Sequence, residues 1–386
     1  MAPWRDDMPR LSTRSTANQQ SRIAWMYRTR RRVALLVASS VLALWLVAWP
    51  SLGSSSRRTP FEHNLGPPAG NTTWSAVGDQ QVPPFVHYVF GLSPDFGGKP
   101  FSFIHFVCVM SALRKLKPET IYVHHVYEPT GFYWDEIQRE IANSGTTKLE
   151  LVKQRDVTHI FGNKVEHYAH KADVLRLEAL RDYGGIYLDI DVLVVKDLGP
   201  LYRHATVMGM ESQPNTDPQL PPSGLCNAVI LSRPYSPFIS RWMETYRTFS
   251  KEKWAKHSVT TPWDLARAYP SEITVLNKFA FFWPIWHDDH LRLIHRSASY
   301  PFHSKPSPLA PTSDSQFTYH LWESVAFDRY LSPYDPDRIH NRGFKTGSER
   351  EEDGASDENS FSKETRQYVS LKMRHRWRAA KAKGLL

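Results

Sequence analysis

The sequence predicts an α/β fold with a mostly parallel central sheet, preceded by a single transmembrane helix. From residue 83 onward, short apolar runs of strand length alternate with helical patterns, the order that parallel strands joined by crossover helices produce. Residues 33–49 form an uncharged apolar run long enough to span a bilayer. The chain holds two cysteines in 386 residues, which excludes a small scaffold held together by disulfides.

Each expected element rests on a local pattern. Runs rich in apolar and β-branched residues predict strands, and apolar residues at helical spacing predict helices. The pair Gly184-Gly185 is a strong signal for the end of the third helix. Strands are expected at 85–91, 120–126, 148–153, 186–195, 207–211, 227–232, 273–276 and 317–321, and helices at 101–116, 134–143, 171–183 and 238–249.

Five regions are expected along the chain. They are a basic cytosolic tail (1–32), a signal anchor (33–50), a stem rich in Ser, Pro and Gly (51–82), the folded domain (83–340) and a charged, flexible tail (341–386). Four arginines directly before the apolar run place the N-terminus in the cytosol and the folded domain across the membrane. A short span suits the thin membranes of the Golgi or ER. A cleaved signal peptide is the alternative, although the run exceeds the usual apolar length of about 7–15 residues.

Two further features bear on the compartment. Asn71 begins an N-glycosylation acceptor on the expected lumenal side of the membrane. Cys108 and Cys226 could pair in an oxidising lumen, or remain two unrelated buried thiols.

The net charge of +9 does not indicate a nucleic-acid-binding protein. Eight arginines against two aspartates lie in residues 1–32, and eight Lys or Arg against one glutamate lie in residues 363–386. The summed charge of these two tails is larger than the net charge of the whole chain, so the chain between them is mildly acidic. The basic residues therefore lie outside the expected fold and partly across a membrane.

The candidate chemistry lies in residues 171–192. On a strand that continues to residue 195, Asp189 and Asp191 would project to the same face. Two like charges this close are costly unless a cation neutralises them, and carboxylate oxygens suit Mg²⁺ or Mn²⁺. The alternative is a pair of strand-end aspartates that cap a turn or pair with Lys196.

The preceding helix brings two more polar side chains to the same crevice. Asp173 and Arg176 are three residues apart and so share one face of the helix. The glycine pair ends that helix and returns the chain into the strand of the two aspartates. We therefore expect these four side chains to meet at strand carboxyl ends, where α/β proteins bind their ligands.

These residues resemble a known family. The segment Asp-x-x-x-Arg, followed by Tyr-Gly-Gly-Ile-Tyr-Leu-Asp-x-Asp, is similar to the signature of glycosyltransferase family 32, which includes fungal Golgi α-mannosyltransferases and animal α-1,4-galactosyl- and N-acetylglucosaminyltransferases. The resemblance is strongest over 171–197 and extends over about 83–335. It implies a GT-A catalytic domain, a GDP-mannose or UDP-hexose donor, a divalent cation (Mn²⁺ or Mg²⁺), and retention at the anomeric carbon. The implied acceptor is a hydroxyl of a glycan or glycolipid.

The resemblance also implies roles for single residues. The catalytic set is Asp191, Asp189 and Asn227, the donor-binding set is Asp173, Arg176, Val89, Phe90, Gly91 and Trp322, and the metal ligands are Asp189, Asp191 and His320. The chain departs from some members of the family at residues 260–262, where Thr-Thr-Pro replaces Thr-Gly-Pro, and this weakens any inference about the acceptor.

Two rival functions remain open at the level of sequence. One is a non-catalytic lumenal subunit that binds a nucleotide sugar or glycan on the same fold. The intact acidic pair argues against it, since a subunit freed from catalysis need not keep the pair. The other is a metal-dependent hydrolase of phosphate esters, a chemistry that usually needs two metals and more carboxylates than cluster here.

Overall fold

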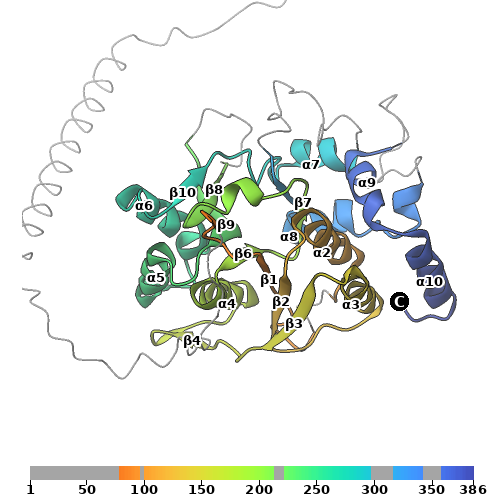
Figure 1. Cartoon of the computed structure of the whole chain (residues 1–386), viewed down its shortest axis with the longest axis horizontal. Coiled ribbons are helices and arrows are strands. Elements are labelled where there is room, and N and C mark those ends of the chain that lie inside the picture. The colour runs from red at the N-terminus through yellow and green to blue at the C-terminus, as the bar shows by residue number, and fades with distance from the viewer. Residues whose placement is uncertain (1–77, 96–99, 213–220, 297–315, 342–357) are drawn as a thin grey trace, which may run out of the picture. The chain divides into compact units, whose positions relative to one another are not determined.

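The structure is a computed structural model that describes residues 78–95, 100–212, 221–296, 316–341 and 358–386 (Figure 1). The expected cytosolic tail, signal anchor and most of the stem, with Asn71, lie outside these ranges. Within the described residues, no helix combines the length and apolar character needed to cross a membrane.

A seven-stranded sheet forms the centre of the fold. All its strands run in one direction except β9, which is antiparallel to both of its neighbours. The mostly parallel sheet expected from the sequence is therefore confirmed. In spatial order the strands are β10 (Thr274–Leu276), β8 (Thr206–Glu211), β9 (Gly224–Ser232), β6 (Gly185–Leu188), β1 (Phe85–Val89), β2 (Thr120–His125) and β3 (Lys148–Lys153).

The strand order reverses between β1 and β6. The chain passes from β1 outward to β2 and β3, and then returns to add β6 on the other side of β1. In open α/β sheets such a reversal leaves a crevice outside the carboxyl ends of the two strands, and ligands bind in that crevice. Val89 and Leu188 are the last residues of these two strands.

Helices cover both faces of the sheet (Figure 1). One buried cluster joins the sheet to α2 and α3, and a second joins it to α4, α5 and α6. The helices are α2 (Phe103–Leu116), α3 (Phe132–Ser144), α4 (Tyr168–Tyr183), α5 (Pro237–Glu244), α6 (Thr261–Ala268), α7 (Asp288–His295), α8 (Glu323–Ala326), α9 (Ser360–Thr365) and α10 (Leu371–Ala382). Shorter helical turns lie at Gly199–Leu201, Thr245–Thr248, Lys256–Thr260, Phe327–Leu331, Arg338–His340 and Arg366–Tyr368.

The expected long strand at 186–195 is wrong, because two shorter strands replace it. The strand β6 ends at Leu188, and β7 (Val192–Val194) pairs with β11 (Thr318–His320) in a separate antiparallel sheet. The Val192 amide donates to the Asp189 carbonyl, which closes a turn over Asp189-Ile190-Asp191. The two aspartates therefore lie in a link between sheets. A second small pair, β4 (His159–Ile160) and β5 (Asn163–Lys164), forms a hairpin.

A buried histidine, His87, contacts the turn between α4 and β6. Gly184 and Gly185 have φ of +65° and +103°, values that L side chains rarely adopt. His87 Nε2 lies 2.8 Å from the Gly184 carbonyl oxygen, and His87 Nδ1 lies 3.0 Å from His124 Nε2. Burial lowers the pKa of His87 to about 4, so the ring is neutral at pH 7. The turn thereby fixes the direction in which β6 leaves α4.

We expect Gly185→Ala to lower the free energy of unfolding by more than about 2 kcal/mol, because it combines backbone strain with a clash. A Cβ at Gly185 would lie 2.7 Å from the carbonyl oxygen of Phe85. Gly131 is the matched control, because its φ is +100° and a Cβ there would meet no atom within 4 Å. Urea unfolding of both alanine variants separates the two effects, and equal losses would show that the close contact has no cost.

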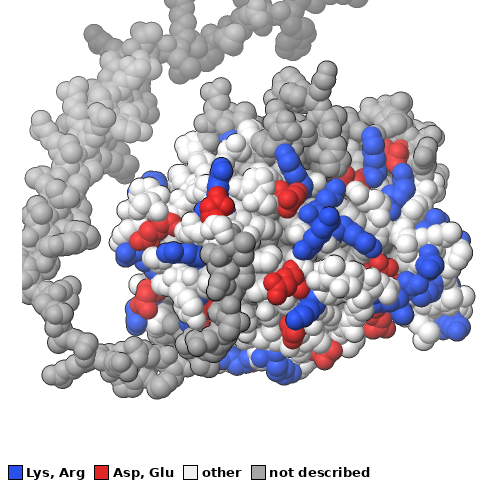
Figure 2. All heavy atoms as spheres, viewed as in Figure 1, with Lys and Arg blue, Asp and Glu red and all other residues white. Residues whose placement is uncertain are grey.

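The C-terminal segment differs from the flexible tail expected from the sequence. Within 341–386, the described residues 358–386 form α9 and α10, and their apolar side chains pack into the core. Arg376 pairs with the buried Glu136 of α3, and Trp377 Nε1 donates to Tyr133 Oη at 2.9 Å. The buried apolar side chains of this segment are Phe361, Tyr368, Val369, Met373 and Trp377. On the face in Figure 2, Lys and Arg gather over α10, and further groups of them lie near the centre and at the lower edge.

Both cysteines are free thiols in the structure. Cys108 lies on α2 and Cys226 on β9, and each is buried. Of the two alternatives, the structure has the separate buried thiols.

Candidate active site

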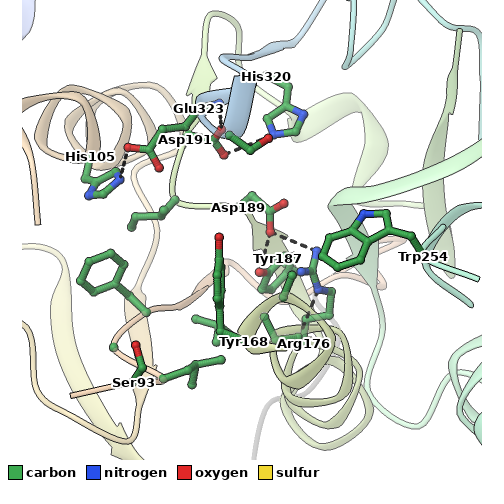
Figure 3. Close-up of a pocket in the computed structure, with 18 residues that line it drawn as sticks. Ser93, His105, Tyr168, Arg176, Tyr187, Asp189, Asp191, Trp254, His320 and Glu323 are labelled. Carbon is green, nitrogen blue, oxygen red and sulfur yellow. Dashed lines mark hydrogen bonds and ion pairs between the residues drawn. The ribbon is translucent and has the colours of Figure 1, made fainter. Parts of the chain in front are cut away.

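A cavity of about 280 Å³ opens at the carboxyl ends of β1 and β6, where the strand order reverses (Figure 3). Its lining comes from segments far apart in the sequence: the end of β1, one face of α4, the turn after β6, and the segment around β11 and α8. The lining residues are Val89, Phe90, Gly91, Leu92, Ser93, His105, Tyr168, Ala169, Ala172, Arg176, Tyr187, Asp189, Ile190, Asp191, Trp254, His320, Glu323 and Ser324.

Three of these side chains form a candidate cation site. Asp189 and Asp191 come from the turn between β6 and β7, and His320 is the last residue of β11. One ligand atom from each lies within 4.8 Å of the other two. The pairing of β11 with β7 creates this arrangement, because it sets His320 opposite Val192, the residue after Asp191.

The Asp191 carboxylate is held at both oxygens. His320 Nε2 lies 3.2 Å from Oδ1, and the Glu323 amide donates to Oδ2 at 2.8 Å. Burial by itself would raise the pKa of Asp191, but His320 and this amide outweigh burial and lower the pKa to about 2. Asp191 is therefore ionised across the physiological range.

Arg176 connects Asp173 and Asn227 to the turn Asp189-Ile190-Asp191, which we call the acidic turn. Its Nη1 lies 3.0 Å from Asp189 Oδ1 and donates to the Asn227 carbonyl at 2.7 Å, while Nη2 lies 3.3 Å from Asp173 Oδ1. The guanidinium also stacks on the Tyr187 ring at 4.5 Å, and the Tyr187 hydroxyl donates to Asp189 Oδ1 at 2.7 Å. Burial by itself would lower the pKa of Arg176, but Asp189, Tyr187 and Asp173 outweigh burial and raise the pKa above its ordinary value. The arginine therefore stays charged.

The structure brings most of the residues expected at the site together. Val89, Phe90 and Gly91 line the cavity beside Arg176, Asp189, Asp191 and His320. Asp173 and Asn227 lie one layer behind the wall, where the Asn227 amide nitrogen donates to Asp173 Oδ1 at 2.6 Å. Burial raises the pKa of Asp173. Both residues contact Arg176, so in this structure they support the cavity wall.

Trp322 is also placed behind the wall. Its indole nitrogen donates to the Pro284 carbonyl at 3.2 Å, and its ring lies 4.1 Å from the His320 ring. The side chain is 9% exposed, so it packs behind His320 and outside the lining. Its backbone has φ of +55°, which turns the chain from β11 into α8.

The sequence reasoning missed two exposed aromatic residues at the cavity. Tyr168 is 48% exposed and Trp254 is 56% exposed, and both line the wall (Figure 3). Tyr168, Ala172 and Arg176 recur every four residues on α4, so the spacing that groups helix faces could have found Tyr168. Trp254 lies against the rings of His167 and His170, a contact that no sequence pattern signals.

The ligand set fits the cation expected from the sequence. Two carboxylates and an imidazole are ligands that Mn²⁺ accepts, and Mg²⁺ prefers the carboxylates. Two anionic ligands held within 4.8 Å repel each other unless a cation lies between them. Three ligands also leave coordination positions open for the oxygens of a substrate. Asp189, Asp191 and His320 are thus the residues that would hold such an ion.

The fold and this acidic turn define a sugar transferase of the DXD class. Residues 106–209 match a model described as a glycosyltransferase sugar-binding region containing the DXD motif. The chain is 40% identical over 295 residues to glucan organizing enzyme 1 of Cryptococcus neoformans var. grubii. The matched region covers 75% of this chain and 72% of that protein. The chain therefore belongs to the DXD-containing sugar transferases of glycosyltransferase family 32, as the sequence resemblance predicted.

The chain also has more distant similarities to one further protein and to solved structures. An uncharacterized protein of Arabidopsis thaliana is 33% identical over 105 residues, which is 25% of this chain and 15% of that protein. The apo form of the glycosyltransferase GlyE of Streptococcus pneumoniae is 11% identical with a TM-score of 0.40, covering 79% of this chain and 64% of that one. The galactosyltransferase LgtC is 13% identical with a TM-score of 0.33, covering 66% and 93%. Scores this low carry no argument about function.

Proposed function

We propose that this chain is a metal-dependent hexosyltransferase with a GT-A catalytic domain. It moves a hexose from GDP-mannose or a UDP-hexose to a hydroxyl of a glycan or glycolipid, with retention of anomeric configuration. The observation that carries this proposal is the convergence of Asp189, Asp191 and His320 beside Arg176, at the crevice where β1 and β6 end.

The roles of the residues follow from their charges and places. A divalent cation, when bound, takes up negative charge as the bond to the diphosphate breaks. Arg176 adds a fixed positive charge beside the acidic turn, and Asp189 and Tyr187 hold its guanidinium in place. Asp173 and the Asn227 carbonyl contact the same guanidinium from behind the cavity wall and fix its position. The apolar end of β1, with Val89, Phe90 and Gly91, receives the nucleoside.

We propose further that the enzyme is a single-pass type II protein of the Golgi or ER membrane, with the catalytic domain in the lumen. The support is the sequence of residues 28–50, in which arginines precede an uncharged apolar run. The relative from Cryptococcus carries glucan in its name, so glucan oligosaccharides belong among the acceptors to be tested.

The test is nucleotide release by the full-length chain, purified in detergent, from GDP-mannose, UDP-galactose, UDP-N-acetylglucosamine and UDP-glucose. Each donor is incubated with Mn²⁺ or with EDTA, with and without glucan oligosaccharides. We expect release from one donor, lost with EDTA and in the variant in which Asp189 and Asp191 are both alanine. The anomeric coupling constant of the product, measured by NMR, reports retention. Donor binding without release under any condition would favour the non-catalytic subunit, and release that persists in EDTA would contradict the metal requirement.

A further inference from the structure

Glu323 is a carboxylate in the cavity wall that has no role in the function proposed so far. It is the first residue of α8, directly after Trp322, and its side chain is 13% exposed. Its amide donates to Asp191 Oδ2, so its backbone is fixed to the acidic turn. Its carboxylate turns the other way, and Oε1 lies 3.1 Å from His105 Nε2 (Figure 3).

His105 orients this carboxylate and is itself locked in one tautomer. The Ser102 amide, which caps α2, lies 3.1 Å from His105 Nδ1 and can only donate to it. The Nδ1 atom is therefore an acceptor, and the ring proton lies on Nε2, facing Glu323. The His105 side chain is 1% exposed, and the rings of Phe90 and Phe101 pack against it. The histidine thus donates to Oε1, and no group of the described residues hydrogen-bonds Oε2.

Glu323 is outside the cation ligand set. That set contains Asp189, Asp191 and His320, and His105 holds the Glu323 carboxylate on the other side of the acidic turn. The His105 ring contacts Phe90 at 5.2 Å between centroids, and Phe90 directly follows β1. The Glu323 carboxylate consequently lies between the acidic turn and the apolar end of β1.

The two ends of the cavity suit different parts of a nucleotide sugar. The diphosphate carries the negative charge and needs the cation and Arg176, which lie at the end of β6. The base is flat and uncharged, and it suits the apolar wall of Val89, Phe90 and Leu92. The sugar that joins base to diphosphate must span the region between these ends, where Glu323 lies.

We propose that the Glu323 carboxylate binds the ribose hydroxyls of the donor nucleotide. This assignment rests on the proposed function and names a residue that would recognise the ribose of the proposed donors. A carboxylate only accepts hydrogen bonds, so it selects a sugar that presents hydroxyl donors. Glu323 should therefore make the enzyme discriminate against nucleotides whose sugar lacks these hydroxyls.

The experiment is calorimetric binding of GDP and UDP, and of their 2′,3′-dideoxy forms, to the full-length chain with Mn²⁺. A hydrogen bond to a charged group contributes about 1.5–3 kcal/mol, which is roughly a 10- to 100-fold preference for the ribonucleotide. We expect Glu323→Ala to lose that preference by weakening ribonucleotide binding alone, leaving dideoxynucleotide binding unchanged. Glu323→Gln keeps the shape of the side chain and should lose most of the preference. Asp328→Asn is the matched control, because it removes one exposed negative charge from the segment that follows α8.

The outcomes separate this assignment from the function on which it rests. A wild-type chain that binds ribonucleotides and dideoxynucleotides equally would overturn the assignment alone. A tenfold preference that survives in both Glu323 variants would also overturn it. If neither GDP nor UDP bound to the wild-type chain, the proposed function would fail, and the assignment with it.

Discussion

Nucleotide release should fall by about a thousandfold or more when Asp191 is replaced by asparagine, because the change removes an anionic ligand from the cation site. Asparagine keeps the shape of the side chain and an oxygen that can still accept from the Glu323 amide. The fold should therefore persist. The measurement is initial velocity at saturating donor and Mn²⁺, beside circular dichroism of the same preparation.

Thermal unfolding gives a second measurement of the same change. A cation that binds only the folded state raises Tm, since it stabilises by an amount that grows with the logarithm of its concentration. We expect Mn²⁺ to raise the Tm of the wild-type chain and of Asp328→Asn, and to leave that of Asp191→Asn nearly unchanged. Wild-type velocity in Asp191→Asn, or an undiminished rise in its Tm, would refute the cation site.

Replacing Arg176 with methionine should lower the free energy of unfolding by about 3–5 kcal/mol, since it leaves buried carboxylates without their counter-charge. Arg176 is 5% exposed, and Asp173 beside it is 8% exposed. The Arg176 side chain also donates to the Asn227 carbonyl and pairs with Asp189. Its loss therefore removes the polar contacts through which it joins α4 to β9 and to the acidic turn. Urea unfolding followed by tryptophan fluorescence measures the change.

Arg267→Gln is the control for this stability effect. Its ion pair with Asp264 also spans three residues of a helix, but the two side chains are 62% and 57% exposed. Exposed pairs contribute about 0–1 kcal/mol, so this variant should unfold close to the wild-type midpoint. Similar midpoints for the two variants would mean that the buried network around Arg176 adds no stability.

Much of the fold was predictable because its elements depend on local signals. The β-branched residues of β2 and the glycine pair after α4 mark their elements without tertiary context. The strand expected at 186–195 is wrong, because Ile190 and the valines after it continue the apolar pattern although the chain changes sheets. Only the pairing of β7 with β11, more than a hundred residues later, shows where the first strand ends. Hydrophobic periodicity carries no information about that partner.

The site was predictable to the extent that its residues adjoin one another in the sequence. Asp173, Arg176, Asp189 and Asp191 were found together because one helix, one turn and one strand carry them. His105 and Trp254 come from elements that the chain brings to the cavity from far away, so no spacing could indicate them. The C-terminal helices had a visible signal, because Met373 and Trp377 are four residues apart and face the core together.

The junction between the two sheets also sets when the candidate cation site can form during synthesis of the chain. Asp189 and Asp191 leave the ribosome directly after β6, when β1, β2 and β3 have already been synthesised. His320 and its strand β11 emerge only after well over a hundred further residues, and β11 must then pair with β7 to bring the imidazole to the aspartates. A nascent chain that stops before Thr318 carries an acidic turn without its third ligand. During synthesis, both aspartates of the acidic turn are therefore present before the chain contains the third candidate ligand of the cation site.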